Sequence, residues 1–388
     1  MSPPRRDVQH AELDVAHRLL DGSLTLRRSG EATIRSIEEE VAMKNQSTLL
    51  RIATDPRTWI VASALATAGG RALGRRLTRF DLRNRTVLIT GGTRGLGLEL
   101  ARQAGLAGAR VAICGRDSDT LARARESLAE TGSAVLALTC DVTDRHQVAE
   151  LIQSVQASFG HIDVLINNAG MVDVGPVSVM TAADFERDMA TNFWGPLNAI
   201  LAVLPHMRPR GEGRIVNIAS IGGKVSVPHL LPYSSSKFAL VGLSEGLCAE
   251  LRASGILVTT VCPGLMRTGS PRHATFKGQH NAEYTWFSLA DSLPLLSMDV
   301  ERAARRILKA VRHGNSHVVL SLPAKVADKV HGLFPGLTSD ALGLANRLLP
   351  GTENREDGME GQNCRPVVSV PWLVARADRA AARHNQTG

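Results

Sequence analysis

Short apolar runs alternate with helix-like segments between residue 82 and about residue 312, and this alternation constrains the fold more than any other feature. Uninterrupted apolar runs are typical of strands that are buried on both faces of a parallel sheet. The segments between them are long enough for right-handed crossovers through helices. We therefore predict an α/β fold, a doubly wound parallel sheet of about seven strands in the Rossmann arrangement. The predicted strands are residues 86–90, 110–114, 134–138, 164–166, 214–218, 257–261 and 318–320.

The 388 residues divide into three parts on the basis of this pattern. Residues 1–81 are predicted to form a helical N-terminal extension, and residues 82–325 the Rossmann domain. Residues 326–388 are predicted to form a C-terminal helical extension and tail. Because residues 350–388 are rich in Gly, Asn, Arg and Glu, we expect little of this tail to be buried and most of it to be loosely ordered.

The formal net charge of +8 points to an anionic partner, and part of it lies in an arginine run within residues 71–85. The sequence contains no helix-turn-helix, zinc-ligand or ribonucleoprotein pattern, so we expect no nucleic-acid partner and no metal. The apolar segment 59–70 is too short to span a bilayer, which needs about 20 apolar residues. Residues 57–85 therefore either pack on the main domain or contact an anionic membrane surface, and both interpretations stay open.

The cysteines and the start of the chain bear on location. Five cysteines are scattered through the sequence without a Cys-x-x-Cys spacing or a disulfide framework. Residues 1–6 are followed by mixed charge, not by the apolar core and cleavage site of a secretory signal. A reducing, cytoplasmic location fits best, with or without membrane association.

A glycine-rich turn with the pattern Gly-x-x-x-Gly-x-Gly joins the first predicted strand to its helix. Glycines let the backbone approach a pyrophosphate, and the N-terminus of the following helix supplies N–H donors and a favourable dipole. The position of this turn between a strand and a helix predicts nucleotide binding. Its candidate cofactor-binding residues are Thr90, Gly91, Thr93, Arg94, Gly95, Leu96 and Gly97.

The end of the second predicted strand, Cys114-Gly115-Arg116, favours NADP(H) over NAD(H). NAD enzymes place an acidic residue there for the ribose hydroxyls, and the chain has none at this point. Arg116, together with Arg94 in the glycine turn, suits the geometry and charge of a 2′-phosphate. Asp117 follows one residue later, so NAD(H) stays open as an alternative.

A tyrosine and a lysine four residues apart, Tyr233 and Lys237, lie on one face of a predicted helix. A free phenol has a pKa of about 10. A neighbouring ammonium favours the phenolate, so we expect Lys237 to lower the pKa of Tyr233 toward the working pH. Ser220 lies 13 residues upstream of Tyr233 (233 − 220 = 13), and a serine can donate to a developing oxyanion.

These motifs together resemble the short-chain dehydrogenase/reductase family over roughly residues 82–312. The chain departs from the family's compact core only at its two extended ends. The residues that carry the resemblance are the glycine turn with Thr90, Gly91, Gly95 and Gly97, then Asp141, Val142, Asn167, Asn168, Ala169, Gly170, Asn192, Ser220, Tyr233, Lys237, Pro263, Gly264 and Thr268.

The resemblance implies an oxidoreductase that moves a hydride between a nicotinamide and a carbonyl or secondary alcohol. Tyr233 would donate the proton, Ser220 would bind the developing oxyanion, and Lys237 would also bind the nicotinamide ribose. Asn192 would hold a water that links Lys237 to solvent. These four residues are the predicted catalytic set.

The resemblance also implies further cofactor contacts. Asp141 and Val142 would touch the adenine, and Asn168, Ala169 and Gly170 would lie beside the cofactor at the end of the fourth strand. The remaining contacts would cover the nicotinamide end, and they come from Pro263, Gly264 and Thr268.

Residues 269–298 would form a mobile lid over the substrate. They hold much of the scarce aromatic content, with Phe276, Tyr284, Trp286 and Phe287. These side chains either pack the lid on the core or line a lipophilic pocket for a fatty acyl, steroid or polyketide-like carbonyl, and both interpretations stay open. We expect His229 to be a wall of the same cleft.

The leading hypothesis is thus an NADP(H)-dependent oxidoreductase with a small-molecule carbonyl or alcohol substrate. Two alternatives stay open. One is a catalytically silent NADP(H)-binding regulatory protein, because a fold alone says nothing about activity. The other is an NAD-dependent alcohol dehydrogenase. Family members also imply a homo-oligomer through helices on the flanks of the sheet, although the extensions could block those contacts.

Overall fold

The computed structural model describes residues 80–293, 297–351, 357–368 and 381–386, with Ser63, Gly70 and Arg379 as isolated positions. The backbone divides into two compact units, residues 1–74 and 75–388. Only Ser63 and Gly70 are described in the first unit, so the predicted helical extension lies almost wholly outside the described residues. The predicted domain boundaries at residues 81 and 325 stay predictions.

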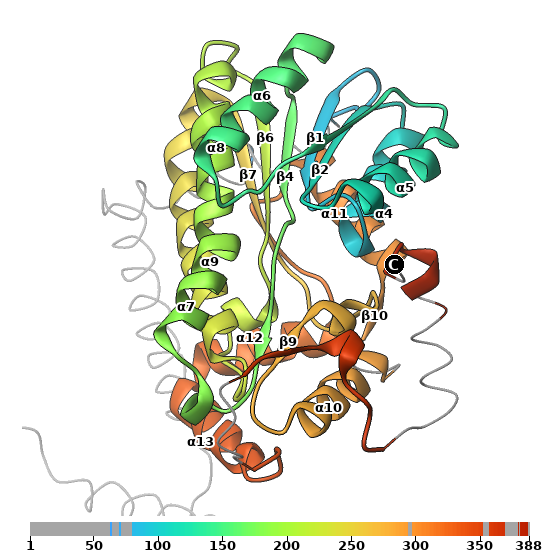
Figure 1. The fold of residues 1–388 in the computed structure, drawn as a ribbon. Coiled ribbons are helices and arrows are strands. Elements are labelled where there is room, and N and C mark those ends of the chain that lie inside the picture. Colours follow the sequence, from blue (N-terminus) through green and yellow to red (C-terminus); the bar gives the residue numbers. More distant parts are fainter. Residues whose placement is uncertain are drawn as a thin grey trace, which may run out of the picture. The chain divides into compact units, whose positions relative to one another are not determined.

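The centre of the second unit is a parallel sheet of seven strands, as the sequence predicts (Figure 1). The strand order is β11-β7-β6-β4-β1-β2-β3, so the direction of winding reverses between β1 and β4. Ligands bind at the carboxyl ends of the strands beside such a switch point. The strands are β1 (Thr86–Thr90), β2 (Arg110–Gly115), β3 (Val135–Thr139), β4 (Val164–Asn167), β6 (Gly213–Ile218), β7 (Ile256–Cys262) and β11 (His317–Val319).

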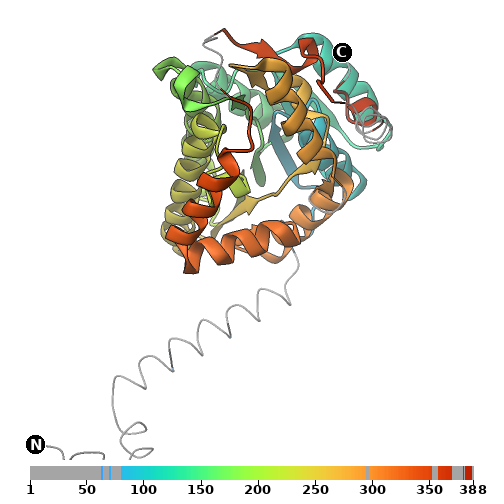
Figure 2. The same cartoon turned by 90° about the horizontal axis from the view of Figure 1, so that it is seen from below.

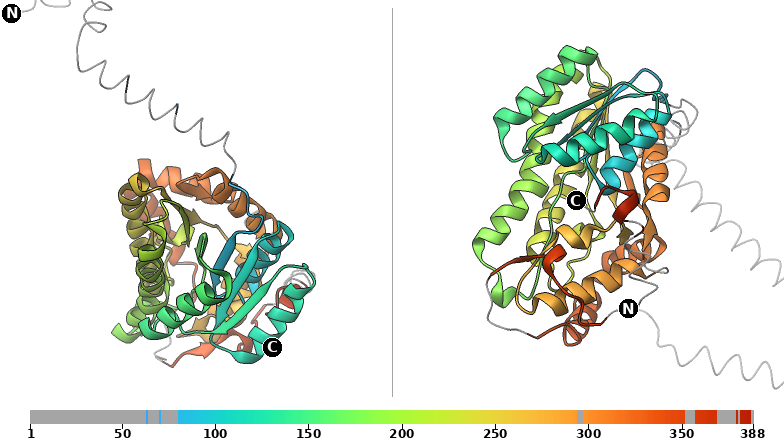
Figure 3. Two further views of the ribbon diagram at one scale, coloured as in Figure 1. Left: turned by 90° about the horizontal axis from the view of Figure 1, so that it is seen from above. Right: turned by 45° about the vertical axis from the view of Figure 1, so that its right-hand side comes forward.

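Helices cover both faces of the sheet, because side chains that alternate along each strand must be buried on both sides (Figures 1 and 3). Val87 and Ile89 of β1 belong to one apolar cluster and Leu88 to the other. Each buried side chain of this size contributes about 1.5–3 kcal/mol. The first face carries α4 (Gly95–Leu106), α5 (Ser118–Ala129) and α11 (Val300–His313), and the second α6 (Arg145–Phe159), α8 (Gly195–Met207) and α9 (Leu231–Leu251).

Aspartates set the starts of several of these helices. Asp117 accepts a hydrogen bond from the backbone N–H of Thr120 at 2.7 Å, and Asp144 accepts one from His146 at 2.8 Å. Asp299 caps α11 through Glu301 N at 3.2 Å. A cap of this kind contributes about 1 kcal/mol, and the one from Asp117 sets the start of α5 at Ser118.

Shorter elements gather at the carboxyl end of the sheet (Figure 2). Two small sheets pair β8 with β10 and order β5, β9 and β12 side by side. The strands are β5 (Asp173–Val174), β8 (Met266–Arg267), β9 (Thr275–Phe276), β10 (Met298–Asp299) and β12 (Met359–Glu360), and the helices α7 (Ala182–Met189), α10 (His280–Ser292), α12 (Leu322–Leu333) and α13 (Pro335–Asn346). Single helical turns cover Val177–Val179, Ala190–Trp194, Ile221–Gly223, Arg252–Ser254, Ser270–His273 and Gly361–Asn363.

The C-terminal tail differs from the expectation for its described parts. We expected residues 350–388 to be loosely ordered, but β12 pairs antiparallel with β9, and Cys364, Ala381 and His384 are buried. The composition predicted exposure because it reflects only the polarity of the tail itself. The contacts that bury these residues are made with parts of the chain about 80 to 290 positions earlier. In the part of the chain that is described, no helix is both long and apolar enough to cross a bilayer.

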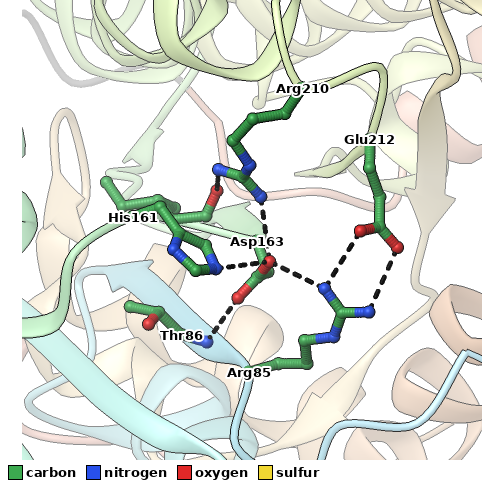
Figure 4. Close-up of polar contacts among 7 residues, drawn as sticks. Arg85, Thr86, His161, Asp163, Arg210 and Glu212 are labelled. Atoms are coloured by element: carbon green, nitrogen blue, oxygen red, sulfur yellow. Dashed lines mark hydrogen bonds and ion pairs between the residues drawn. The ribbon is translucent and has the colours of Figure 1, made fainter.

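A buried ionic cluster occupies the amino end of the sheet, opposite the switch point (Figure 4). Asp163 is fully buried and accepts from Thr86 N at 2.9 Å. Arg85 and Arg210 contact the same carboxylate at 3.1 and 2.9 Å, and Arg85 also pairs with Glu212 at 3.0 Å. The last arginine of the predicted basic run is therefore used inside the domain.

Candidate active site

The glycine turn is held against the end of β4 by polar contacts. Thr90 Oγ1 accepts hydrogen bonds from the backbone N–H groups of Asn168 and Ala169, at 3.1 and 3.2 Å. Asn168 Nδ2 donates to the Gly91 carbonyl at 2.9 Å. Two segments that were predicted to bind the cofactor, the turn and residues 168–170, are thus brought together at the switch point.

Two glycines of the turn cannot carry a side chain. A Cβ on Gly91, whose φ is +62°, would lie 2.8 Å from the Ala169 Cα. A Cβ on Gly97 would lie 2.2 Å from the Gly91 carbonyl oxygen. Because these two positions have no side chains, α4 can begin at Gly95, soon after the strand. The first N–H groups of the helix then face the turn. This arrangement, with Leu96 in the same first turn, can hold a diphosphate.

The two arginines predicted for a 2′-phosphate lie close enough to affect each other. Burial lowers the pKa of Arg94, and the positive charge of Arg116 lowers it further. Arg116 is exposed, and Thr93 lies against the residue before it, because a Cβ on Gly115 would be 2.6 Å from the Thr93 Cγ2. Two neighbouring cations that repel each other favour an anion between them.

Asp117, the residue that left NAD(H) open, is occupied as a helix cap. Its Oδ1 accepts from both the backbone N–H and the hydroxyl of Thr120, at 2.7 and 2.8 Å. These hydrogen bonds lower the pKa of the Asp117 carboxyl, so it is ionised at neutral pH. A carboxylate committed to the first turn of α5 has less capacity for a ribose.

Asp141 and Val142 follow β3. Asp141 Oδ1 accepts from the backbone N–H and hydroxyl of Thr143, at 2.9 and 2.8 Å. Val142 is buried, and its carbonyl accepts from Asn198 Nδ2 at 3.2 Å. Both residues sit at the carboxyl edge of the sheet, and their contact with an adenine stays a prediction.

Asn192 lies in a π-helical turn, Ala190–Trp194, between α7 and α8. Single π turns inside helices often occur at functional sites. Asn192 is fully buried; its Oδ1 accepts from Met171 N at 3.1 Å, and its Nδ2 donates to Ser236 Oγ at 3.0 Å. A Cβ on Gly170 would lie 3.0 Å from Asn192 Oδ1 and 3.5 Å from Lys237 Nζ. Asn192, Gly170 and Lys237 are therefore neighbours.

Ser220 and Tyr233 meet at the start of α9. Ser220 Oγ accepts from Gly222 N at 3.0 Å, which leaves its proton free to donate, and the Ser220 hydroxyl hydrogen-bonds the Tyr233 phenol. A Cβ on Gly222 would lie 3.2 Å from the Tyr233 ring and 3.4 Å from Ser220 Oγ. The structure therefore brings the predicted proton donor and oxyanion donor together.

The pKa of Tyr233 is opposite to the expectation from the sequence. Burial raises it to about 12, and the hydrogen bond from Ser220 opposes this shift without reversing it. Burial also lowers the pKa of Lys237 to about 8. The expected lowering of the phenol pKa by Lys237 is not found, since desolvation outweighs the other influences on both groups. A phenol with a raised pKa is protonated at neutral pH, as a general acid must be.

Lys237 is buried behind the Tyr233 ring. Its Nζ donates to the Ile218 carbonyl at 3.0 Å and lies 5.7 Å from the centroid of the Tyr233 ring. The Ile218 carbonyl is at the end of β6, so the sheet holds the ammonium in place. This position fits a lysine that reaches both the tyrosine and a nicotinamide ribose.

The segment after β7 completes the carboxyl edge. The Pro263 carbonyl accepts from Ile221 N at 2.7 Å, and a Cβ on Gly264 would lie 2.5 Å from Ser321 Oγ. Thr268 is buried, and its Oγ1 accepts from Ser270 N at 3.0 Å. A Cβ on Gly95 would lie 3.7 Å from the Thr268 Cβ, so this segment faces the glycine turn.

His229 has a role that the sequence did not predict. Its backbone φ is +62°, which is uncommon for a residue with a side chain, and its Nδ1 lies 2.8 Å from Glu283 Oε1 on α10. Glu283 is fully buried, and its other oxygen accepts from Trp286 Nε1 at 2.6 Å. The pair ties the segment before Tyr233 to α10, which lies in the segment predicted to form a lid.

Asp188 on α7 is a second residue that sequence reasoning missed. It is fully buried, and burial raises its pKa to about 8. Its negative charge contributes to the raised pKa of Tyr233 and opposes the lowered pKa of Lys237. The available signal was an acidic residue one helical turn before Asn192.

The chain was compared with known proteins. The family model for short chain dehydrogenases matches residues 85–276. The chain is 34% identical over 267 residues to dehydrogenase/reductase SDR family member 7B of Bos taurus, covering 67% of this chain and 80% of that protein. The chain belongs to the short-chain dehydrogenase family. It is also 36% identical over 194 residues to the fatty acyl-CoA reductase of Acinetobacter baylyi, covering 50% of this chain and 66% of that protein.

Solved structures of the short-chain dehydrogenase family have the same fold. An actinorhodin polyketide ketoreductase variant crystallised with NADPH is 32% identical, with a TM-score of 0.55, and covers 61% of this chain and 95% of its own. A family member from Burkholderia phymatum solved with NAD has a TM-score of 0.62 at 23% identity, covers 66% of this chain and 96% of its own, and shows the fold alone. The chain is thus a short-chain dehydrogenase/reductase, an enzyme that acts on CH–OH or C=O groups with NAD(P).

Proposed function

We propose that this enzyme is an NADP(H)-dependent reductase of lipophilic carbonyl compounds that can also oxidise the corresponding secondary alcohols. The observation that carries the proposal is the Ser220–Tyr233 contact backed by Lys237. This set joins a protonated phenol, a hydroxyl donor and an ammonium at the edge of the sheet where the glycine turn lies.

The chemistry requires a hydride on the carbonyl carbon and a proton on the carbonyl oxygen. Bound NADPH would supply the hydride. Tyr233 gives its proton to the oxygen, and the raised pKa of its phenol keeps that proton in place until the oxygen becomes basic. Ser220 donates a hydrogen bond to the developing oxyanion. Lys237 stabilises the phenolate that is left, and Asn192 positions the segment behind it.

The preference for NADP(H) rests on Arg94 and Arg116. Burial lowers the pKa of Arg94 and the charge of Arg116 lowers it further, so a phosphate between them would relieve their repulsion. Asp117, the acid nearest to the end of β2, is engaged with Thr120. The related polyketide ketoreductase crystallised with NADPH supports the same preference.

The lipophilic substrate class is supported by the surroundings of the lid helix α10. A cavity of about 290 Å³ lies between α10 and the segment around residues 361–368. Its lining combines apolar and charged side chains, and none of the four predicted catalytic residues belongs to it; it includes Tyr284, Leu289, Val368, Arg267, Arg272 and Asp291. Other aromatic side chains of the predicted lid pack on each other, with the ring centroids of Phe276 and Phe287 5.9 Å apart. These rings stabilise the segment and do not line the cavity. Among the described residues, the predicted lid segment therefore contains aromatic side chains that pack on each other, and it also borders a cavity. Leu295 and Leu296 lie outside them.

We further propose that the domain rests on an anionic membrane, and that the surface formed by α12 and α13 takes part. Clustered exposed apolar side chains are unusual on a monomer surface and mark interaction sites. Exposed Lys325, Lys329 and Arg347 supply cations on or next to these helices, which also carry the acids Asp328 and Asp340. The exposed apolar residues are Leu322, Val326, Val330, Leu333, Phe334, Leu337, Leu344 and Leu348. Most of the predicted membrane segment 57–85 lies outside the described residues; the cytoplasmic location and the homo-oligomer stay predictions.

A carbonyl panel assayed with NADPH and NADH in parallel tests the function. We expect turnover with NADPH, faster on long-chain or polycyclic ketones than on short polar ones. Tyr233→Phe removes only the phenolic hydroxyl, so it should lose turnover by at least about 100-fold, the contribution of a general acid, and keep NADPH binding. Normal turnover in this variant would refute the assignment of Tyr233, and a preference for sugars or short hydroxy acids would refute the substrate class.

A further inference from the structure

The end of the chain lies on the glycine turn. The His384 carbonyl accepts a hydrogen bond from Gly95 N at 2.8 Å, and Asn385 Nδ2 donates to the Thr93 carbonyl at 2.9 Å. Gly95 is the first residue of α4, so its N–H is one of the donors that the helix leaves without an internal partner. Figures 1 and 3 show this C-terminal turn, in red, beside the start of α4.

Asn385 also joins the turn to α5. Its Nδ2 lies 3.2 Å from the Thr120 carbonyl, and its Oδ1 accepts from Arg123 Nε at 3.2 Å. The residue has a φ of +54°, a left-handed conformation that asparagine adopts more easily than most residues. Every polar atom of this side chain is therefore used on the elements that flank the predicted adenosine side of the cofactor site.

Gln386 lies between the glycine turn and the segment after β7. A Cβ on Gly95 would be 2.7 Å from Gln386 Nε2 and 3.7 Å from the Thr268 Cβ. A Cβ on Gly269 would be 2.8 Å from the Ala381 Cβ. Thr93, Gly95 and Thr268 are all residues predicted to bind the cofactor. The tail thus contacts both walls between which a dinucleotide would lie.

These contacts are specific, yet one of them is incomplete. Ala381, His384 and Gln386 are buried, which excludes a loose association. Gln386 Oε1, however, is buried with no hydrogen-bond partner among the described residues. A buried acceptor without a partner is costly, so release of Gln386 to water would recover a hydrogen bond for its Oε1. This packing suits a segment that can be displaced.

We propose that residues 381–386 form an autoinhibitory segment that competes with the dinucleotide for the glycine turn. The inference rests on the proposed function, because it assumes that the turn binds NADP(H). The Gly95 N–H cannot serve the His384 carbonyl and a phosphate oxygen at once, and the Gln386 side chain lies where the diphosphate would pass. The cofactor therefore binds only to molecules whose tail has left, and its apparent dissociation constant is the intrinsic one divided by the fraction of open molecules.

Binding of NADPH to the full chain and to a chain that ends at residue 378 tests the proposal. Calorimetry or nucleotide fluorescence should show about tenfold tighter binding without the tail, as expected if about a tenth of the molecules are open. Asn385→Ala should give a smaller shift in the same direction, because it removes three hydrogen bonds and leaves the backbone contact. Asn346→Ala, at an exposed position on α13, is the matched control and should bind as the unaltered chain does.

A synthetic peptide of residues 379–388 provides an independent readout. Added to the shortened chain, it should weaken NADPH binding in a competitive manner. Equal or weaker NADPH binding by the shortened chain and by Asn385→Ala would overturn the proposal, since a tail that clamps the cofactor weakens binding when removed. If the shortened chain fails to fold, the test is made on Asn385→Ala. Its NADPH binding, with and without the added peptide, then supports or overturns the proposal. If no form of the protein binds NADPH or NADH, the proposed function fails instead.

Discussion

Lys237 Nζ donates to the Ile218 carbonyl at 3.0 Å, so the strand end of β6 holds the ammonium behind the Tyr233 ring. Burial lowers the pKa of Lys237 to about 8 and raises the pKa of Tyr233 to about 12. Two groups with such separated pKa values can be distinguished by their pH dependence.

The reduction rate should fall as the pH rises through about 8. Burial disfavours the charged ammonium and lowers its pKa, so Lys237 is charged below that pH and neutral above it. Tyr233 stays protonated throughout this range and contributes no decline. The pH profile of kcat/KM between pH 6 and 10 gives the midpoint. The residual kcat/KM of Lys237→Met should lose this decline. An unchanged pH dependence in this variant would assign the titration to another group, such as Asp188, whose pKa burial also raises to about 8.

Replacing Arg94 and Arg116, the two arginines proposed to bind a 2′-phosphate, should change cofactor preference more than turnover. Arg94→Ala with Arg116→Ala should raise the KM for NADPH by at least about tenfold per lost charge-assisted contact and leave that for NADH nearly unchanged. Arg125→Ala, an exposed arginine of α5, is the matched control and should alter neither constant. Equal losses with both cofactors would contradict a 2′-phosphate site.

The ionic cluster at the amino end of the sheet should set stability without affecting chemistry. Asp163→Ala removes the shared carboxylate from Arg85 and Arg210 and leaves the buried Thr86 N–H without its acceptor, and should lower the free energy of unfolding by about 1–3 kcal/mol. Glu212→Ala removes the other, half-exposed partner of Arg85 and should cost less than about 1 kcal/mol. Denaturant unfolding measures both. NADPH affinity should be unchanged in each folded variant. If Asp163→Ala and Glu212→Ala lower the free energy of unfolding equally, the buried carboxylate of Asp163 is not the main stabilising group of the cluster.

Membrane binding should depend on the apolar surface of α12 and α13. Leu333→Ser with Leu337→Ser should reduce co-sedimentation with anionic vesicles several-fold, because two exposed apolar side chains no longer enter the lipid interface. Leu106→Ser, an equally exposed leucine at the end of α4, is the control and should sediment as the unaltered chain does. Concentration-dependent self-association that the double variant abolishes, with no vesicle binding by either form, would assign the surface to a second copy.

The sheet and the arrangement of much of the candidate site could be predicted because they rest on local patterns. Each apolar run became a strand close to its predicted bounds, and the glycine turn lies where a strand meets a helix. Tyr233 and Lys237 share a helix face through their spacing alone. The Ser220–Tyr233 contact follows from a fixed interval along the chain.

What could not be predicted depends on long-range contacts and burial. His229 and Glu283 are 54 positions apart, and nothing local marks them as partners. The raised pKa of Tyr233 comes from desolvation, which spacing does not reveal. The docking of Asn385 on Thr93 joins residues 292 positions apart, within a tail whose polar composition indicated exposure.

The π-helical turn around Asn192 has a consequence for insertions and deletions. One residue corresponds to about 100° of rotation in an α-helix. Deleting a residue within Ala190–Trp194 would restore regular α-helix and turn α7 relative to α8 by about that angle. Asn192 could then no longer reach both Met171 and Ser236. The length of this segment is therefore as strongly constrained as the identity of its asparagine. Among variants with insertions or deletions in α7 and α8, those with a change elsewhere on these helices should stay active more often than those with a change within Ala190–Trp194.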